Sequence, residues 1–571
     1  MLCPVAVRVV ECHRLMTLPM NEYLLSPLGP ALILLAGSIL LRIVASPRRA
    51  SVLALLTLVP LGLTFASLLR MQTLGAATWQ FTWWPLVTPQ IQVRWALDGW
   101  NWLALAMIVL VGSCSVLLTW RLPGKRAGAY HGLSMLFMAA AAITVVSDSL
   151  LVLSAAWVAT DIVLVARARG GRPQAAAAPF WLEVSGSLLV MVAIGITSLP
   201  AATASLATAP LSSEALALLL IAAAIRMAAY PLHLWLAPSG VARDRGTQLL
   251  INGVGMATGA WLLGTCYSLG AAYWLSSPIW PPLLAVAALA ASLAAWSGNR
   301  RDRLAMVGSG RAIWLWFLLA LAPAAAGRDA LGWGMVSVLL GLMLLAIGQS
   351  INEQWRWRLP LAIAALTLAG VPLTTGMPAR ALAGPENLLL AFLLLITSSL
   401  TVACVFLSWN PERSSETVDL PSRASTALWL AGGHVNWPVF RLLLALGLAL
   451  VPSLLWGLQP TRLAESAGFA MVLSLGQLLQ SLGLVRLIGS FVVVALAIGL
   501  AQALRQPENH PELWRTRLAT VTGLRWALQG LRWIAKWGEI GWRNALGVVE
   551  GEGYFGWIAL FLALAWFIIQ I

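Results

Sequence analysis

A few ionisable side chains interrupt the long apolar runs of this 571-residue sequence, and their chemistry is informative. Asp161 lies in "LSAAWVATDIVLVA", Arg226 and His233 lie in "AAAIRMAAYPLHLWLAP", and Arg380 ends "AALTLAGVPLTTGMPAR". An ionised group at the centre of a membrane helix costs roughly 2.5–3.5 kcal/mol on insertion scales unless it is paired or hydrated. These residues therefore predict an ion path or a buried charge pair.

Prolines accompany two of these charges. Pro231 follows Arg226 by five residues and removes one backbone hydrogen bond, so the carbonyl of Met227 is free to bind water or a neighbouring side chain. Pro372 interrupts the run that ends at Arg380. We expect a helix break at each proline, an arrangement that is common in transporters. Proline kinks also occur for packing alone, and both interpretations stay open.

Other polar residues in the apolar runs extend the candidate site. Asn252 and Thr258 follow in the next run, where they could line a hydrated path. His233 could transfer a proton or fill a hydrogen-bonded packing role. Glu183 lies near one end of its apolar run, which favours a position at the membrane interface.

The elements that must position these residues are membrane helices. The chain is 60% hydrophobic and 10% charged, with a mean hydropathy of +0.84, which is typical of an all-α polytopic membrane protein. Apolar runs of about 20 residues cross the roughly 30 Å of membrane hydrocarbon. About sixteen such runs occur, near 27–45, 51–70, 100–120, 131–146, 149–167, 179–199, 214–236, 247–268, 278–298, 305–325, 331–350, 359–378, 387–408, 439–457, 484–504 and 554–571.

Lysine and arginine are distributed unevenly over the connecting loops. One alternate set of loops holds about 17 basic residues and the other about 4, namely Arg94, Arg328, Arg380 and Arg462. Because basic loops are retained on the cytoplasmic side, the pattern predicts a multi-pass protein of a bacterial inner (plasma) membrane with both termini outside. The net charge of +15 then belongs mostly to the inner loops and does not indicate nucleic-acid binding.

Residues 1–26 are expected to form an N-terminal tail. They lack the compact apolar core and small-residue cleavage site of a signal peptide. Cys3, Cys12 and His13 could form a disulfide or a metal site, but the five cysteines show no paired metal spacing. A disordered tail is the simpler interpretation, and the sequence predicts no metal site.

Several segments differ in composition from the main series of spans. Residues 78–96 alternate apolar and polar residues and predict a β-hairpin on the outer surface. Residues 506–553 combine a basic face with abundant tryptophan, which predicts an amphipathic interfacial helix, with a simple linker as the alternative. The remaining divisions are a core at 27–408, a cytoplasmic loop at 409–438, additional membrane helices at 439–505 and a terminal span at 554–571.

Four stretches occur in order along the core: "LDGWNW" (97–102), "SDSLLVLSAAWVATD" (147–161), "IRMAAYPLHLWLAPSGVA" (225–242) and "AALTLAGVPLTTGMPAR" (364–380). They resemble the antiporter-like membrane subunits of respiratory complex I (its chain 5 and chain 4 type), of multisubunit cation/proton antiporters and of membrane-bound hydrogenases. The resemblance implies about 14 core helices in two inverted repeats with broken helices seven and twelve. An interfacial helix and final membrane helices would follow this core.

In that family, buried glutamates and lysines joined by water carry protons through two related half-channels. Here Val158 stands after Trp157 where the family has a glutamate, and Arg226 and Arg380 stand where it has lysines. The family's next lysine or histidine falls near Thr258. Lysine can release a proton on burial, whereas arginine keeps its charge. The resemblance therefore implies a divergent member with a degenerate or rewired proton path.

Asp161 lies about one helical turn beyond Val158. We expect Asp161 and Arg226 to form a buried pair in place of the family's glutamate–lysine couple, with a structural or electrostatic role. Such a pair gains little stability over apolar residues, but removal of one partner strands a charge at a cost of about 3–5 kcal/mol.

Three classes of function remain open. The first is a membrane subunit of a proton- or cation-coupled complex related to NADH:quinone oxidoreductase and multisubunit antiporters, conducting or purely structural. The second is the ion-coupling membrane subunit of a two-component transporter of dissolved inorganic carbon (bicarbonate or CO2) with a zinc-bearing peripheral partner. The third is a stand-alone secondary transporter.

The first two classes imply membrane and peripheral partner subunits, and all three imply contact with membrane lipid. The sequence has no Rossmann fingerprint, P-loop or CxxC cluster. It therefore predicts no cofactor and no catalytic or redox centre in this chain.

Overall fold

The computed structural model describes residues 9–10, 26–44, 50–75, 77–84, 91–119, 124–169, 177–236, 245–297, 303–350, 358–383, 388–408 and 437–503. Most of the tail expected at 1–26 and of the loop expected at 409–438 lies outside these residues. The interfacial helix expected at 506–553 and the terminal span expected at 554–571 also lie outside them.

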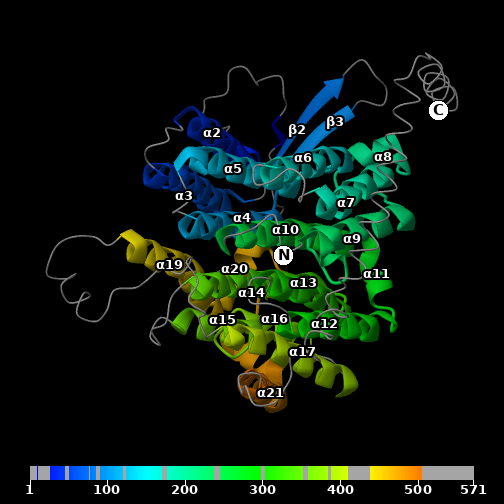
Figure 1. Cartoon of the computed structure of the whole chain (residues 1–571). Coiled ribbons are helices and arrows are strands. Elements are labelled where there is room, and N and C mark those ends of the chain that lie inside the picture. The colour runs from blue at the N-terminus through cyan, green and yellow to red at the C-terminus, as the bar shows by residue number, and fades with distance from the viewer. Residues whose placement is uncertain are drawn as a thin grey trace, which may run out of the picture. The chain divides into compact units, whose positions relative to one another are not determined.

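The described chain is a series of apolar helices whose bounds follow the apolar runs of the sequence (Figure 1). The long helices are α2 (Gly29–Val44), α3 (Ala50–Leu74), α4 (Gly99–Leu118), α5 (Gly124–Val146), α6 (Leu150–Arg169), α7 (Ala177–Gly195), α9 (Ser213–Arg226), α10 (Arg245–Cys266), α12 (Trp280–Ser297), α13 (Arg303–Leu321), α14 (Gly327–Ser350), α15 (Leu359–Ala369), α17 (Leu388–Leu407), α19 (Trp437–Leu458) and α21 (Leu475–Ala503).

Short helical pieces join the long helices. They are α8 (Leu199–Thr203), the 3-10 helix η2 (Leu232–Leu236), the π-helical turn η3 (Tyr267–Ala271), α11 (Ala272–Leu275), α16 (Gly376–Leu382) and α20 (Pro460–Ala467). Among the described residues, 11 helices are long and apolar enough to cross a membrane. The prediction of an all-α polytopic membrane protein is confirmed.

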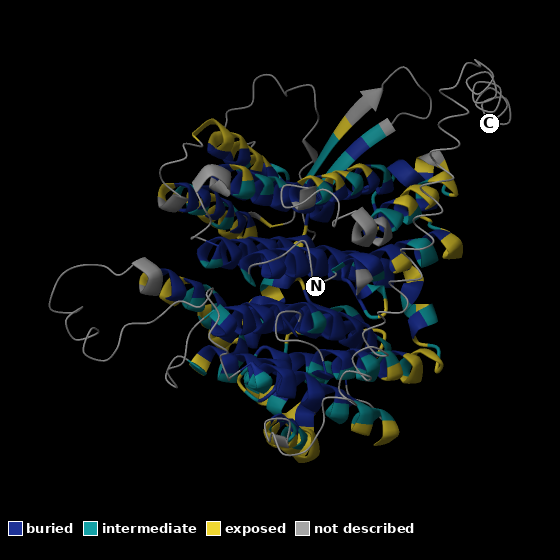
Figure 2. Ribbon diagram, in the orientation of Figure 1, coloured by how far each residue is buried: buried dark blue, intermediate teal, exposed yellow. Residues whose placement is uncertain are grey.

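The buried core of the helical part lies in its central helices (Figure 2). Within the apolar stretches of α4, α10 and α14, 94%, 94% and 100% of the residues are buried inside the protein. The corresponding share is 22% for α21. A membrane helix that buries little of its apolar surface in its own chain places the rest against lipid or against another membrane helix. Helices α4, α10 and α14 are therefore the scaffold, and α21 is peripheral.

The hairpin expected at 78–96 is present as strands β2 (Ala77–Trp84) and β3 (Ile91–Leu97). They pair antiparallel, with Thr78 opposite Ala96 and Trp79 opposite Trp95. The two indole rings stack with their centroids 5.2 Å apart. A two-residue strand, β1 (Val9–Val10), adds to β2 in parallel.

The turn between α5 and α6 attaches this hairpin to the helices. Nε of Arg94 in β3 lies 3.5 Å from Oδ2 of Asp148, and the hydroxyl of Ser205 donates to Oδ1 of the same carboxylate at 2.7 Å. Burial raises the pKa of the Asp148 carboxyl, and the Ser205 hydrogen bond and the Arg94 charge oppose that rise. Asp148 thus links the hairpin to the connection that follows α7.

The "LDGWNW" stretch ties α4 to α10. Asp98 caps α4 by accepting a hydrogen bond from the backbone N–H of Asn101 at 2.8 Å. The indole of Trp261 in α10 donates to Oδ1 of Asn101 at 2.6 Å, and the indole of Trp100 donates to the carbonyl of Trp261 at 3.1 Å. These hydrogen bonds fix the register of the two central helices.

Candidate ion-path site

The first helix break lies where Pro231 predicts it. Helix α9 ends at Arg226, and the chain makes a turn over 227–231 before it enters η2. The indole of Trp235 in η2 donates a 2.8 Å hydrogen bond back to the carbonyl of Ile225. The same carbonyl accepts a 2.9 Å bond from the N–H of Ala228, and the indole takes the place of the i+4 donor that the interrupted helix lacks. The break is thus held by a specific side chain.

Trp235→Phe should destabilise the protein by about 1 kcal/mol, the size of one lost hydrogen bond, because the carbonyl of Ile225 keeps its bond from the N–H of Ala228. Thermal unfolding of the purified protein in detergent measures this effect. Trp274→Phe, in the short helix α11 and outside this break, provides the comparison. Equal stability of Trp235→Phe and the unchanged protein would show that the indole bond does not hold the break.

The second helix break lies where Pro372 predicts it. Helix α15 ends with Gly370 in the left-handed region (φ 66°), and α16 begins at Gly376. A Cβ on Gly370 would lie 2.6 Å from Cδ of Arg380 and 3.0 Å from the carbonyl oxygen of Gly376. The side chain of Arg380 therefore folds back against the break, and Gly370 is needed both for its backbone angle and for space.

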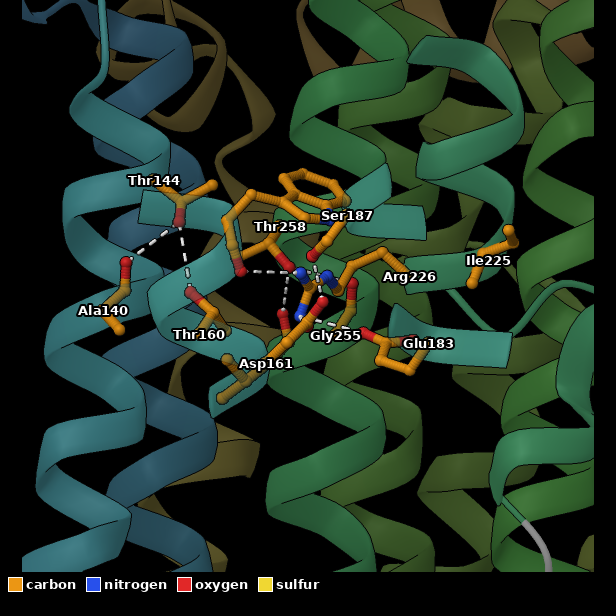
Figure 3. Close-up of polar contacts among 12 residues, drawn as sticks. Ala140, Thr144, Thr160, Asp161, Glu183, Ser187, Ile225, Arg226, Gly255 and Thr258 are labelled. Carbon is orange, nitrogen blue, oxygen red and sulfur yellow. Dashed lines mark hydrogen bonds and ion pairs between the residues drawn. The ribbon is translucent and has the colours of Figure 1, made fainter. Parts of the chain in front are cut away.

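Asp161 and Arg226 meet in the protein interior, as the sequence predicts. Nη1 of Arg226 lies 2.6 Å from Oδ1 of Asp161 and 2.9 Å from Oε1 of Glu183. Figure 3 shows the guanidinium between the two carboxylates, which come from α6 and α7. The side chains of all three residues are at most 5% exposed. They form the acidic–arginine cluster.

Neighbouring groups fix the two ends of this cluster. The hydroxyl of Ser187 donates to Oδ2 of Asp161. Nη2 of Arg226 donates to the carbonyl of Trp157 at 3.3 Å, and the guanidinium lies over the Trp157 ring, 4.3 Å from its centroid. A cation over an indole face is attracted by the ring quadrupole. The arginine is thus bound by two carboxylates, one carbonyl and one aromatic face.

The predicted interfacial position of Glu183 is wrong. Glu183 is 1% exposed and is part of the acidic–arginine cluster. Its place near the end of an apolar run is misleading because α6 and α9 both pack against α7 and bury this side chain. The available signal is spacing: Glu183 and Ser187 are four residues apart and share one face of α7.

The net charge of the three side chains indicates that the cluster can bind one proton. One guanidinium neutralises one carboxylate, so Asp161, Glu183 and Arg226 together carry one negative charge when all are ionised and none when they hold one proton. In an apolar interior the uncompensated charge is unfavourable. Two carboxylates sharing a site favour a single shared proton. The arginine stays charged, and the carboxylates supply the titratable position.

The other predicted path residues lie apart from the direct contacts of the cluster. Thr258 donates to the carbonyls of Val254 (2.9 Å) and Gly255 (3.1 Å) within α10, facing Arg226 in Figure 3. Nδ2 of Asn252 has no hydrogen-bond partner within the described residues. His233 stacks on Tyr230 with a centroid distance of 5.2 Å, and no hydrogen bond or ion pair within the described part joins it to the cluster.

The half of the chain that contains the second break has the opposite charge balance. Arg311 in α13, which the sequence pattern does not single out, is 1% exposed and lies over the Trp314 ring at 4.8 Å. Its Nε and Nη2 have no hydrogen-bond partner within the described chain. Arg311 lies within electrostatic range of Arg380. Among the described residues, no carboxylate forms an ion pair with either arginine.

Solved structures with the same fold include a chain of an Mrp complex and chains of two respiratory complexes. A chain of the Mrp complex from Dietzia sp. superposes with a TM-score of 0.69 at 18% identity, covering 95% of this chain and 63% of that chain. A chain of the membrane-bound sulfane sulfur reductase, an archaeal respiratory membrane complex, gives 0.66 at 16% identity over 95% and 99% of the two chains. A chain of respiratory complex I from Thermus thermophilus gives 0.58 at 20% identity over 83% and 99%.

No protein-family model and no curated protein sequence matches the chain. The structural matches establish the class: a multi-pass membrane protein with the fold of membrane subunits of Mrp and complex I-like assemblies. The resemblance deduced from the four motifs is thereby confirmed as a likeness of fold. The chain spans 63% of the length of the Mrp chain that it matches.

Proposed function

We propose that the chain is a membrane subunit of a proton- or cation-coupled multisubunit complex, in which the acidic–arginine cluster is a rewired proton-binding station. The likeness of fold to chains of such complexes supports the first part of this proposal. The second part rests on one observation: Asp161 and Glu183 both contact Nη1 of Arg226, within 3 Å, in a buried site beside a broken helix.

The two carboxylates replace the usual titratable lysine in this scheme. A proton that reaches the cluster is held by Asp161 or Glu183. When this proton leaves, both carboxylates are ionised, and the positive charge of Arg226 stabilises them. The hydroxyl pair Thr144 and Thr160, with oxygens 3.3 Å apart, provides further buried polar atoms between α5 and α6 (Figure 3). Water could enter at the break after Arg226, where backbone groups are freed from the helix.

Proton uptake into liposomes that contain the purified protein and its co-purifying subunits tests the station. Glu183→Gln and Asp161→Asn should each lower the flux about tenfold or more, because each removes one of the two proton-holding oxygen sets. Arg226→Lys should retain flux, since a cation remains beside the carboxylates. A pH-sensitive dye inside the liposomes and an imposed potassium diffusion potential give the measurement.

Glu214→Gln is the matched control, because this carboxylate lies at the exposed start of α9, outside the cluster. Its flux should equal that of the unchanged protein. Unaltered flux in Glu183→Gln and Asp161→Asn would contradict a proton-carrying cluster. Absence of flux in every preparation would assign the cluster a purely structural role.

Affinity purification of the full chain from its native membrane tests the assignment to a complex. We expect several co-purifying membrane and peripheral subunits. Recovery of one large soluble zinc protein alone would instead favour the two-component carbon transporter. Recovery of the chain without partners would favour a stand-alone transporter.

A further inference from the structure

We propose that the crevice between α16, α17 and the kink of α21 binds an anionic phospholipid, with its phosphate at Arg380 and Arg486 and an acyl chain along the apolar wall. The crevice has a volume of about 880 Å³. Pockets that hold drug-sized ligands span roughly 300–1,000 Å³. The space is therefore sufficient for part of a lipid molecule. This site is separate from the acidic–arginine cluster.

The lining of the crevice is amphipathic and is complementary to a phospholipid. Its wall is mainly aliphatic and aromatic, and its charged lining residues are Arg380 and Arg486. Among the wall residues, Leu388 is 86% exposed and Val485 is 84% exposed. In a membrane protein such exposure means contact with lipid or with another membrane helix. The apolar wall accounts for an acyl chain, and the two arginines account for an acidic headgroup.

Neither arginine is neutralised within the described chain. No ion pair or hydrogen bond of Arg380 or Arg486 occurs among the described residues, and no carboxylate is among the residues that line the crevice. Arginine does not lose its charge on burial in the way lysine does. The two guanidiniums beside this apolar wall therefore favour binding of an anion. Arg311 is buried within electrostatic range of Arg380, has no carboxylate partner among the described residues and adds to the positive potential.

The backbone of α21 creates the opening. Gly483 has φ 63° and ψ 165°, which divides α21 into two helical pieces, and the crevice is lined by residues on both sides of this kink. Side chains other than hydrogen are strained at this backbone conformation. Leu484 directly follows the kink and is 73% exposed, and α21 packs against α17. The crevice is thus a built feature of the helix and faces the membrane.

Native mass spectrometry of the full chain in detergent tests the site, with dioleoyl phosphatidylglycerol and dioleoyl phosphatidylcholine as probes of equal chain length. The unchanged protein should retain phosphatidylglycerol preferentially. Arg486→Ala should weaken retention about fivefold, and the Arg380→Ala/Arg486→Ala pair about 25-fold, as expected from the attraction of one basic residue to an anionic lipid surface. Arg486→Lys should retain most of the binding.

Arg462→Ala, an exposed arginine in α20 outside the crevice, is the matched control and should not change retention. Arg486 is exposed, so its variants test the site even if Arg380→Ala fails to fold. Glu386→Gln should leave retention equal or higher, because it removes the carboxylate nearest in sequence to Arg380.

Three outcomes overturn the proposal. Equal retention of the two lipids would show that the arginines do not select a headgroup. Displacement of the bound lipid by millimolar inorganic phosphate would identify a site for free anions. Absence of retained phosphatidylglycerol in the unchanged protein would show that the crevice does not bind an anionic phospholipid.

Discussion

The Asp161→Ala/Glu183→Ala double variant should be far less stable than either single variant. In each single variant Arg226 keeps one carboxylate partner within 3 Å. We therefore expect a loss of about 1 kcal/mol per single change, the size of a lost hydrogen bond. The double variant leaves Arg226 buried without any carboxylate, which costs about 3–5 kcal/mol. The sum of the single effects should underestimate the double effect by about 2 kcal/mol.

Free energies of unfolding in mixed detergent micelles, together with melting temperatures, measure this coupling. A triple variant that adds Arg226→Leu should recover much of the lost stability, because the stranded cation is removed along with the carboxylates. Additive single effects would contradict a shared role for the two carboxylates. A loss of 3–5 kcal/mol from Asp161→Ala alone would mean that Glu183 does not compensate, which is the expectation from a simple Asp161–Arg226 pair.

The contact between Glu183 and Arg226 changes which combination of substitutions should restore stability. With a two-residue pair, Asp161→Ala combined with Arg226→Leu would be the compensated variant. Because Glu183 also contacts Arg226, that combination leaves a buried carboxylate without its cation. Compensation that does not depend on protonation of Glu183 requires neutralising all three residues of the cluster.

Local chemistry explains what the sequence predicts well. The spans follow apolar runs because the bilayer admits few backbone arrangements other than helices. The breaks follow Pro231 and Pro372 because proline removes a backbone donor at a defined position. The hairpin follows alternation of side chains. Each of these features is decided within about 20 consecutive residues.

Which residues make up the site depends on long-range packing, and the sequence predicts this set less well. Asp161 and Arg226 are found from their unusual depth, but Glu183 is misplaced because its burial is caused by α6 and α9, which are distant in sequence. Arg311 is not singled out, although it lies in an apolar run and Trp314 follows it by three residues, because its proximity to Arg380 is visible only in three dimensions. Whether one side chain is buried depends on which other helices pack against it.

A close helix contact places Arg226 between the carboxylates, and Gly255→Leu or Gly259→Leu should disrupt it. A Cβ on Gly255 would lie 2.8 Å from the carbonyl oxygen of Arg226. A Cβ on Gly259 would lie 2.8 Å from the carbonyl oxygen of Ala223 and 2.9 Å from the backbone nitrogen of Met227. These atoms are backbone, so no side-chain rotation relieves the clash. Small residues four apart let membrane helices approach this closely.

Either leucine should therefore push the end of α9 away from α10 and move the guanidinium of Arg226 relative to Asp161 and Glu183. Overpacking costs about 1–3 kcal/mol and more where backbone must shift, and proton uptake should fall with stability. Gly499→Leu is the matched control, because no atom lies within 4 Å of a Cβ at that position in α21. If Gly259→Leu has the same free energy of unfolding and the same proton uptake as Gly499→Leu, the α9–α10 contact does not position Arg226. If it remains folded but loses proton uptake, the position of the arginine between its two carboxylates is what the cluster requires.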